Sequence, residues 1–229
     1  QESVDWREAF ITTYLERDLP QLGIHTASTT LRRFWTMIAH YHGQILNASE
    51  LGRSLGVTSK TIDSYLDILE STFVVRRLQP WHENLKKRQV KAPKVYVRDS
   101  GLLHALLGLH NQVAVESHPK LGASWEGFAL AEVIYNLGAR PHECHFWATH
   151  GGAELDLLIV RGNRRRGYEF KRSAAPRRTR SMTIAMEDLG LERLDVIHPG
   201  EHTYPIGEGI WATAIGDLGG MGSIEEAGR

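Results

Sequence analysis

Cysteine is almost absent from this sequence of 229 residues, which contains only Cys144. A single cysteine excludes an internal disulfide framework and is typical of a protein from a reducing cytoplasm. Long apolar runs are missing as well, so the sequence predicts neither a transmembrane helix nor a membrane partner. The start also lacks the pattern of a secretory signal. We therefore expect a cytoplasmic protein.

Residue patterns for zinc binding and covalent catalysis are also lacking. His142 and Cys144 would share one face of a strand, but His145 would lie on the other. The chain has no C-x-x-C pair that could complete a structural zinc site. It has no G-x-S-x-G sequence that would present a serine nucleophile. Any catalytic or metal-binding function of this chain must therefore depend on side chains other than these histidines, the cysteine or a serine nucleophile.

Acidic residues are scarce in two stretches of an otherwise neutral protein. Eight Lys or Arg and one acid lie between Arg76 and Arg98, and nine Lys or Arg and one acid lie between Arg161 and Arg180. Such patches indicate polyanion binding, although solvated loops would give the same pattern. The expected contacts to a nucleic-acid backbone are Lys86, Lys87, Arg88, Lys91, Arg164, Arg165, Arg166, Arg172, Arg177 and Arg178.

The first half of the chain is predicted to be mainly helical. Apolar periodicity indicates helices over 4–19 and 31–41. A capping-box variant at 47–50 opens a short helix that Gly56 closes, and Thr58 opens a further helix to about residue 70. Two helices around a glycine turn are typical of a helix-turn-helix. Strands over 73–78 and 94–98 follow, with the basic loop 81–93 as a wing between them, and Asp99 is expected to cap a helix to about Leu107.

The second helix of this helix-turn-helix is a poor candidate for recognising DNA bases. Its expected exposed residues include two aspartates, which repel phosphates, and a role in packing or protein contact stays open. These exposed residues are Ser59, Lys60, Asp63, Ser64 and Asp67.

The second half is predicted to begin after a polar connection over 110–121. The expected elements, in chain order, are a helix over 124–137, strands over 143–149, 154–160 and 166–171, a helix over 179–189 and a strand over 193–198. The residues after about 216 are rich in glycine and predicted to form a frayed tail.

A β-hairpin within this half carries the residues that most directly suggest chemistry. Gly162-Asn163 is a two-residue turn signal between two strand-like runs. The register set by that turn places Asp156 opposite Glu169, and Glu154 opposite Lys171. Alternation along the strands then puts these four on one face of the hairpin. The apolar side chains on the other face are Leu155, Leu157, Ile159, Tyr168 and Phe170.

Two directly opposed carboxylates, Asp156 and Glu169, repel each other at a Cβ separation of about 5 Å. A divalent cation would offset this repulsion, because Mg²⁺ (or Mn²⁺) takes one or two carboxylates together with waters and a substrate phosphate. Lys171 could then orient or deprotonate the attacking water and neutralise developing charge on the phosphate. An ion pair between Glu154 and Lys171 would need no metal, but it would leave the repulsion of Asp156 and Glu169 unexplained.

The spacing from Asp156 to Glu169-Phe170-Lys171 resembles the D…(D/E)-x-K core of restriction-endonuclease-like enzymes. The wider sequence resembles a large bacterial and archaeal family, the domain of unknown function 4143, found C-terminal to an ATPase. The segments that carry this resemblance are Phe146–Asp156, Trp125–Phe128, Tyr14–Pro20 and Tyr96–Leu103, and it extends from about Trp6 to about Trp211.

The resemblance implies a fold of the α+β or α/β class with two domains. Residues 1–110 would form a helical and winged-helix domain, residues 111–215 a restriction-endonuclease-like αβββαβ core, and residues 216–229 a flexible tail. It also implies that Glu126, near the start of a helix, joins the metal site, although a favourable charge at the helix N-terminus explains Glu126 equally well.

The function implied is that of an effector domain of an AAA-type ATPase, acting by Mg²⁺-dependent phosphodiester hydrolysis at Asp156, Glu169 and Lys171. The chain lacks a G-x-x-x-x-G-K-[ST] sequence, so ATP would bind only to an N-terminal half that is not included here. The alternative is a non-catalytic nuclease-like fold that binds DNA or a partner protein and regulates the ATPase. Homo-oligomerisation stays open, as does the choice between DNA and RNA.

Overall fold

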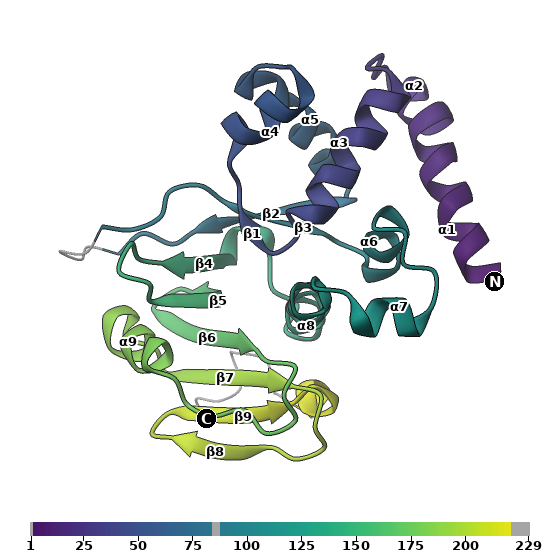
Figure 1. Ribbon diagram of the computed structural model, residues 1–229. Helices are drawn as coiled ribbons and strands as arrows, with labels where there is room; N and C mark the ends of the chain where they lie inside the picture. The colour runs from purple at the N-terminus through teal and green to yellow at the C-terminus, as the bar shows by residue number, and fades with distance from the viewer. Residues whose placement is uncertain (1, 84–87, 221–229) are drawn as a thin grey trace. The chain divides into compact units, whose positions relative to one another are not determined.

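The computed structural model describes residues 2–83 and 88–220 (Figure 1). The protein is mixed α/β and forms two compact units, and each unit is made of two separate segments of the chain. The first unit contains residues 1–77 and 95–127, and the second contains residues 78–94 and 128–229. The chain therefore enters the second unit early, returns to the first, and then enters the second again. The predicted domain boundary near residue 110 stays a prediction.

The first unit begins with one long helical segment in three parts. The α-helix α1 (Glu2–Thr13) continues as a π-helical turn, η1 (Tyr14–Asp18), and ends in the short helix α2 (Leu19–Gln21). The helix predicted over 4–19 is confirmed, and it extends slightly further at both ends. Its buried side chains pack against α3 (Ser28–His40), whose own buried residues are Leu31, Phe34, Trp35, Ile38 and Ala39.

The two helices of the predicted helix-turn-helix are also confirmed. They are α4 (Ala48–Leu55) and α5 (Ser59–Ser71). The Asn47 side chain accepts a hydrogen bond from the Glu50 amide, and the Thr58 side chain accepts one from the Thr61 amide. Gly56 ends α4 in the left-handed conformation, with φ +74°, where a glycine avoids the steric cost of a side chain. The five predicted surface residues of α5 are all exposed.

Strands and further helices complete the first unit. The strand β3 (Lys94–Val97) lies between β1 (Gln44–Ile45) and β2 (Val75–Pro80). Asp99 caps α6 (Ser100–Leu106) by accepting a hydrogen bond from the Leu102 amide, as predicted. The connection predicted over 110–121 is not wholly irregular. It contains the short helix α7 (Gln112–Ser117), which Asn111 caps by accepting a hydrogen bond from the Ala114 amide.

The second unit is built on a large mixed sheet (Figure 1). Its strand order is β2-β4-β5-β6-β7-β9-β8, in which the β2–β4, β6–β7 and β7–β9 pairs are parallel and the others antiparallel. The helix α8 (Leu121–Asn136) enters this unit from the first. The remaining elements are η2 (Pro141–Glu143), β4 (Cys144–Ala148), β5 (Glu154–Arg161), β6 (Arg164–Phe170), α9 (Arg180–Leu189), β7 (Arg193–His198), β8 (Tyr204–Gly207), β9 (Ile210–Ala214) and η3 (Ile215–Gly220).

The helix–strand–strand–strand–helix–strand order predicted from the sequence is confirmed in α8, β4, β5, β6, α9 and β7. The strands β8 and β9 were not predicted; they extend the sheet beyond β7, and β9 is the second parallel neighbour of that strand after β6. Within the predicted tail, residues 216–220 belong to η3, where Leu218 is buried. The rest of that tail, residues 221–229, lies outside the described residues.

One face of this sheet is covered by α9, which packs across β5, β6 and β7. The buried residues between them are Trp147, Ala153, Leu155, Leu158, Met182, Ala185, Leu189, Leu191, Leu194, Val196 and Ile210. At Gly167 of β6 an added Cβ would lie 2.6 Å from Leu191, so a side chain cannot be accommodated there without moving the core. This packing fixes the position of the β5–β6 hairpin, which carries the candidate site.

Candidate active site

The β5–β6 hairpin has the predicted register at its turn. Arg161 pairs with Arg164 across Gly162-Asn163, and the paired ladder continues to Leu157 opposite Tyr168. Gly162 adopts φ +57°, as this type of two-residue turn requires. One further step of the same register would bring Asp156 beside Glu169.

The regular pairing of β5 with β6 ends at Leu157, and the Asp156 side chain instead forms a hydrogen bond with the backbone of β6. Its carboxylate accepts a hydrogen bond from the Phe170 amide, with Oδ2 3.2 Å from the nitrogen. Glu169 and Phe170 meanwhile lie beside Val196 and Ile197 of β7. The carboxylate of Asp156 is thereby fixed at the end of β6, by an amide two residues beyond the last paired residue of that strand, Tyr168.

The predicted alternation of β5 is interrupted at the site. The register between β4 and β5 shifts between His145 and Trp147, and on β5 this shift falls between Leu155 and Leu158. Both of these leucines belong to the cluster against α9, although strict alternation would place them on opposite faces. The prediction that Leu155 shares a face with Leu157 and Ile159 is therefore wrong, because a β-bulge was not foreseen. Bulges commonly re-aim side chains beside functional sites, and Asp156 lies within this one.

Asp156 and Glu169 are both buried, with 7% and 5% of their surface exposed. Burial raises the pKa of the Glu169 carboxyl to about 8, and the nearby charge of Asp156 adds to this effect. The ammonium of Lys171 opposes the shift; its Nζ lies 2.9 Å from Glu169 Oε2 and its side chain is 43% exposed. The Glu169 carboxyl therefore keeps its proton below about pH 8.

Lys94, the first residue of β3, is a member of the site that the sequence did not indicate. Its side chain is buried, and its Nζ lies 2.5 Å from Glu154 Oε1 and 3.3 Å from Asp156 Oδ1. The same ammonium lies 5.7 Å from the centre of the Phe146 ring, close enough for a cation–π contact. The alternative pairing of Glu154 with Lys171 is thus not what the structure has: Glu154 pairs with Lys94, and Lys171 with Glu169.

No sequence pattern could have placed Lys94 there, because it lies 62 residues before Asp156 and within a strand of mixed composition. The only available signal was a lysine at the start of an otherwise apolar strand, Lys94-Val-Tyr-Val97. A buried lysine needs a carboxylate partner, so Lys94 indicates that an acidic residue lies nearby, but it does not indicate which acidic residue that is.

Carboxylate oxygens are suitable ligands for a hard divalent cation, but this site offers few of them. Among residues 2–83 and 88–220, no group of three His, Cys, Asp or Glu side chains is arranged to hold a metal. Two carboxylates, Asp156 and Glu169, are nevertheless within the range that Mg²⁺ uses when waters and a substrate phosphate complete its shell. The raised pKa of Glu169 is consistent with a site that a cation would relieve.

Glu126, predicted as a supplementary metal ligand, belongs to the first unit, whereas Asp156 and Glu169 belong to the second. Within the first unit its Oε1 accepts a hydrogen bond of 2.6 Å from the Tyr96 hydroxyl. Glu126 therefore has a defined partner near its own helix, and its role at the metal site stays a prediction.

The predicted nucleic-acid contacts fall into two groups. Two arginines of β6 pair with acids: Arg164 pairs with Glu192, and Arg165 pairs with Glu83 and lies over the Trp81 ring. Arg166 of the same strand is buried. The remaining described residues are exposed, and Lys86 and Lys87 lie outside the described residues. The exposed group consists of Arg88, Lys91, Arg172, Arg177 and Arg178.

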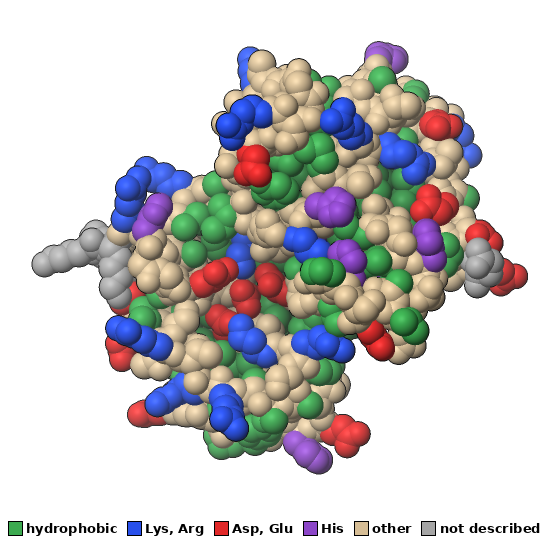
Figure 2. Space-filling model, viewed as in Figure 1, with side chains coloured by type: hydrophobic (Ala, Val, Ile, Leu, Met, Phe, Trp, Pro, Cys, Tyr) green, Lys and Arg blue, Asp and Glu red, His purple; other side chains and the backbone are tan. Residues whose placement is uncertain are grey.

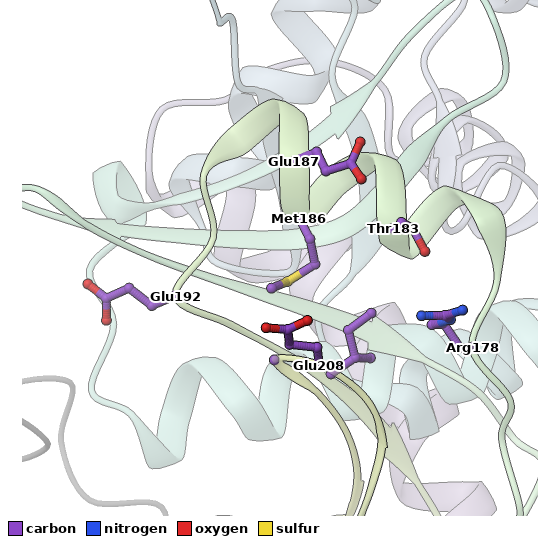
Figure 3. Close-up of a pocket in the computed structure, with 8 residues that line it drawn as sticks. Arg178, Thr183, Met186, Glu187, Glu192 and Glu208 are labelled. Carbon is purple, nitrogen blue, oxygen red and sulfur yellow. The ribbon is translucent and has the colours of Figure 1, made fainter.

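Arg178 has an acidic environment despite its exposure. It lines a hollow of about 440 Å³ formed by α9 and the segments around β7, β8 and β9. Figure 3 shows Arg178 and Glu192 at opposite ends of this hollow, with Met186 and Glu208 between them. Because three glutamates line the hollow, Arg178 is a weaker candidate than Arg172 or Arg177 for a phosphate contact. Figure 2 shows acidic side chains gathered over the β5–β6 region, with basic side chains beside them.

Two family models match the chain, each over a different part of it. Residues 121–218 match the domain of unknown function DUF4143. Residues 1–113 match a different family model, the domain of unknown function DUF8612. The predicted extent of the first resemblance, from Trp6 to Trp211, was therefore too long at its N-terminal side.

Two curated relatives are similar to nearly the whole chain. They are the uncharacterized protein Rv2008c of Mycobacterium tuberculosis and the uncharacterized protein Mb2031c of Mycobacterium bovis. Each is 46% identical over 226 residues, which cover 99% of this chain and 51% of the relative. The chain thus spans about half the length of these relatives. No solved structure matches it significantly.

Among the described residues, no helix has both the length and the apolar character needed to cross a membrane.

The raised pKa of Glu169 predicts how stability depends on pH. The native carboxyl keeps its proton up to about pH 8, whereas an unfolded chain releases it near pH 4.5. The native state therefore binds more protons between these values, and the free energy of unfolding should fall as the pH rises through this window. Glu169→Gln should flatten that fall, an effect on the order of a few kcal/mol.

Urea unfolding from pH 5 to pH 8.5 in EDTA would measure this effect. Glu201→Gln, at an exposed position of the same unit, is the matched control and should keep the wild-type slope. Parallel curves for the wild type and Glu169→Gln would contradict the assignment of a protonated, buried carboxyl.

Proposed function

We propose that this protein hydrolyses phosphodiester bonds in nucleic acid, with a divalent metal held by Asp156 and Glu169. The observation that carries this proposal is the pair of buried carboxylates at the end of the hairpin, with a lysine two residues beyond the second. Burying two carboxylates together is costly unless a cation compensates them. The raised pKa of Glu169 is the measurable sign of that cost.

Each residue has a role that follows from its position. Asp156 and Glu169 would hold Mg²⁺ or Mn²⁺, and the bound ion would supply Lewis-acid activation of a water and charge stabilisation at the phosphate. Lys171 is half exposed and anchored by Glu169, so its ammonium can meet a substrate phosphate while remaining at the site. Arg172 and Arg177, both exposed, follow Lys171 in the chain and would hold the nucleic-acid backbone. Glu126 stays a proposed supplementary ligand.

The fold supports the same proposal at a coarser level. The α8-β4-β5-β6-α9-β7 order is that expected for a restriction-endonuclease-like core, and α4, α5, β2 and β3 follow in the order expected for a winged helix. The curated relatives are about twice as long as this chain. We propose that their additional half is the ATPase and that this chain is its effector domain.

Lys94 favours a second candidate function, a non-catalytic nuclease-like fold that binds DNA or a partner protein. Its ammonium already compensates Glu154 and Asp156, so part of the charge that a metal would neutralise is balanced from within the protein. A site that has exchanged a metal for a lysine would keep the fold and the basic surface without the reaction. The two functions differ in their need for a divalent cation.

The proposed hydrolysis is tested by removing the metal. We expect the wild type to cleave single-stranded or duplex DNA or RNA when Mg²⁺ or Mn²⁺ is present in excess, and to give no product in EDTA. End-labelled oligonucleotides on denaturing gels would show the products. Binding in EDTA, measured by fluorescence anisotropy at several salt concentrations, separates affinity from cleavage.

The outcomes distinguish the two candidates. Cleavage that EDTA abolishes and that added Mn²⁺ restores supports the metal-dependent reaction. Salt-sensitive binding that survives EDTA, with intact nucleic acid in every metal condition, supports the non-catalytic function instead. Because the relatives are longer than this chain, the same assay should also be run on a full-length relative.

A further inference from the structure

A second group of polar side chains lies on the same sheet, on strands β6, β7 and β9. Arg166 lies directly beside Arg193, and Tyr168 lies beside Asp195, which in turn lies beside Trp211. Directly opposed residues of neighbouring strands project from the same face, and so do residues two apart on one strand. These five side chains therefore form one cluster on one face of the sheet.

The single carboxylate of this cluster, that of Asp195, already has hydrogen-bond partners at both of its oxygens. Asp195 has no exposed surface, and it accepts hydrogen bonds from the Arg193 guanidinium at 2.6 to 3.0 Å. The Thr213 hydroxyl donates a further bond of 2.7 Å to the same carboxylate. Arg193 also lies 4.7 Å from the centre of the Trp211 ring, as in a cation–π pair. One acid thus compensates one of the two arginines.

Arg166 is the arginine that remains. It is 9% exposed, and among the described residues no carboxylate forms an ion pair with it. Its Nε and the Tyr168 hydroxyl are both buried, and among the described residues neither has a carboxylate or carbonyl acceptor; the group that acts on the hydroxyl is the Arg166 guanidinium itself. A buried charge and two buried donors without acceptors each cost free energy, of about 1 to 3 kcal/mol per neutral group and more for a charge.

We propose that Arg166 and Tyr168 form a binding site for a phosphate-type oxyanion, with Arg193 at its rim. An oxyanion supplies what the cluster lacks, namely a negative charge beside Arg166 and oxygen acceptors for its Nε–H and for the Tyr168 hydroxyl. The side chain of Arg193 is one-third exposed, so the cluster reaches the surface at that residue. A planar guanidinium recognises phosphate in this way with paired, directed hydrogen bonds.

The site is distinct from the carboxylates at Asp156 and Glu169, and it needs no metal. The phosphate could come from free inorganic phosphate or from the backbone or end of a nucleic acid, since all of them present the same oxygens. If the source is nucleic acid, the proposal also gives the substrate of the proposed function a second anchoring point. Its failure would leave the metal-dependent site untouched, because the two share no residue.

Titration of inorganic phosphate in EDTA tests the proposal. We expect saturable binding by calorimetry, and a rise in the melting temperature that equal ionic strengths of chloride do not reproduce. Arg166→Gln should weaken phosphate binding by about tenfold or more, as expected for the loss of a charged hydrogen bond. Arg53→Gln removes the same charge from an exposed position of α4 and should bind phosphate as the wild type does.

Tyr168→Phe keeps the test decisive if Arg166→Gln fails to fold. Removing an unpaired buried hydroxyl should leave the phosphate-free protein at least as stable as the wild type, while phosphate binding weakens several-fold. Absence of saturable binding to the wild type would overturn the proposal, and so would equal binding by both variants. Two oligonucleotides, one with a 5′-phosphate and one with a 5′-hydroxyl, then distinguish the end of a nucleic acid from free phosphate as the ligand. If inorganic phosphate displaces only the 5′-phosphorylated form, the site binds a nucleic-acid end. If neither oligonucleotide is displaced, the site binds free phosphate; either result supports the site.

Discussion

Asp156→Asn is expected to abolish the saturable binding of Mn²⁺ or Mg²⁺ and any metal-dependent cleavage. Asparagine has nearly the same volume, and its side-chain oxygen can still accept the hydrogen bond from the Phe170 amide. The substitution therefore removes the charge that a metal requires while it keeps the local structure. A loss of one of two carboxylate ligands should weaken binding by at least about a hundredfold, since hard cations depend on ligand charge.

Calorimetric titration of Mn²⁺ into the wild type and the variant is the direct measurement. Asp63→Asn, at an exposed position of α5 in the other unit, carries the same change of charge and should bind as the wild type does. Unchanged affinity in Asp156→Asn would place any metal elsewhere in the molecule. No binding to either protein, also in the presence of a non-cleavable nucleic-acid analogue, would favour the non-catalytic function.

Lys94→Met should give the largest loss of stability among the substitutions at this site. The side chain is buried, and its ammonium contacts both Glu154 and Asp156, so methionine would fill the space and leave the acids without a cation. Breaking a buried ion pair from one side costs about 3 to 5 kcal/mol, because the remaining charge stays buried. Urea unfolding in EDTA at pH 7 would measure the difference.

The same variant tests whether Lys94 and a metal compete for one patch of negative charge. If they do, Mg²⁺ should stabilise Lys94→Met more than it stabilises the wild type, by mass action on the native state. Lys91→Met, three residues earlier at an exposed position, is the matched control and should change neither property. Equal stability of Lys94→Met and the wild type would mean that the ion pairs around Lys94 contribute little.

Features that depend on neighbouring residues were predictable from the sequence. The caps at Asn47, Thr58 and Asp99 each use a side chain that reaches an amide three residues later, so the pattern contains the whole interaction. The turn at Gly162-Asn163 likewise sets its own register, which holds from Arg161 opposite Arg164 to Leu157 opposite Tyr168.

Features that depend on distant parts of the chain were not predictable in the same way. The β-bulge in β5 arises from its pairing with β4, and nothing within β5 itself marks it. The arrival of Lys94 at Glu154 and Asp156 requires the path of β3, which sequence spacing does not reveal. The strands β8 and β9 are short, and their place beside β7 is set by the packing of the whole sheet.

Residues 78–94 belong to the second unit although the chain on both sides of them belongs to the first, and this limits how the protein can be cut into fragments that fold. A fragment that begins at residue 121, where the DUF4143 match begins, would lose both the parallel neighbour of β4 and the lysine that neutralises Asp156. It would then present an unpaired strand edge, a common cause of aggregation, next to uncompensated acids. Recombinant expression and domain exchange between relatives should therefore keep residues 78–94 together with residues 128–220, since this compact unit is discontinuous in sequence.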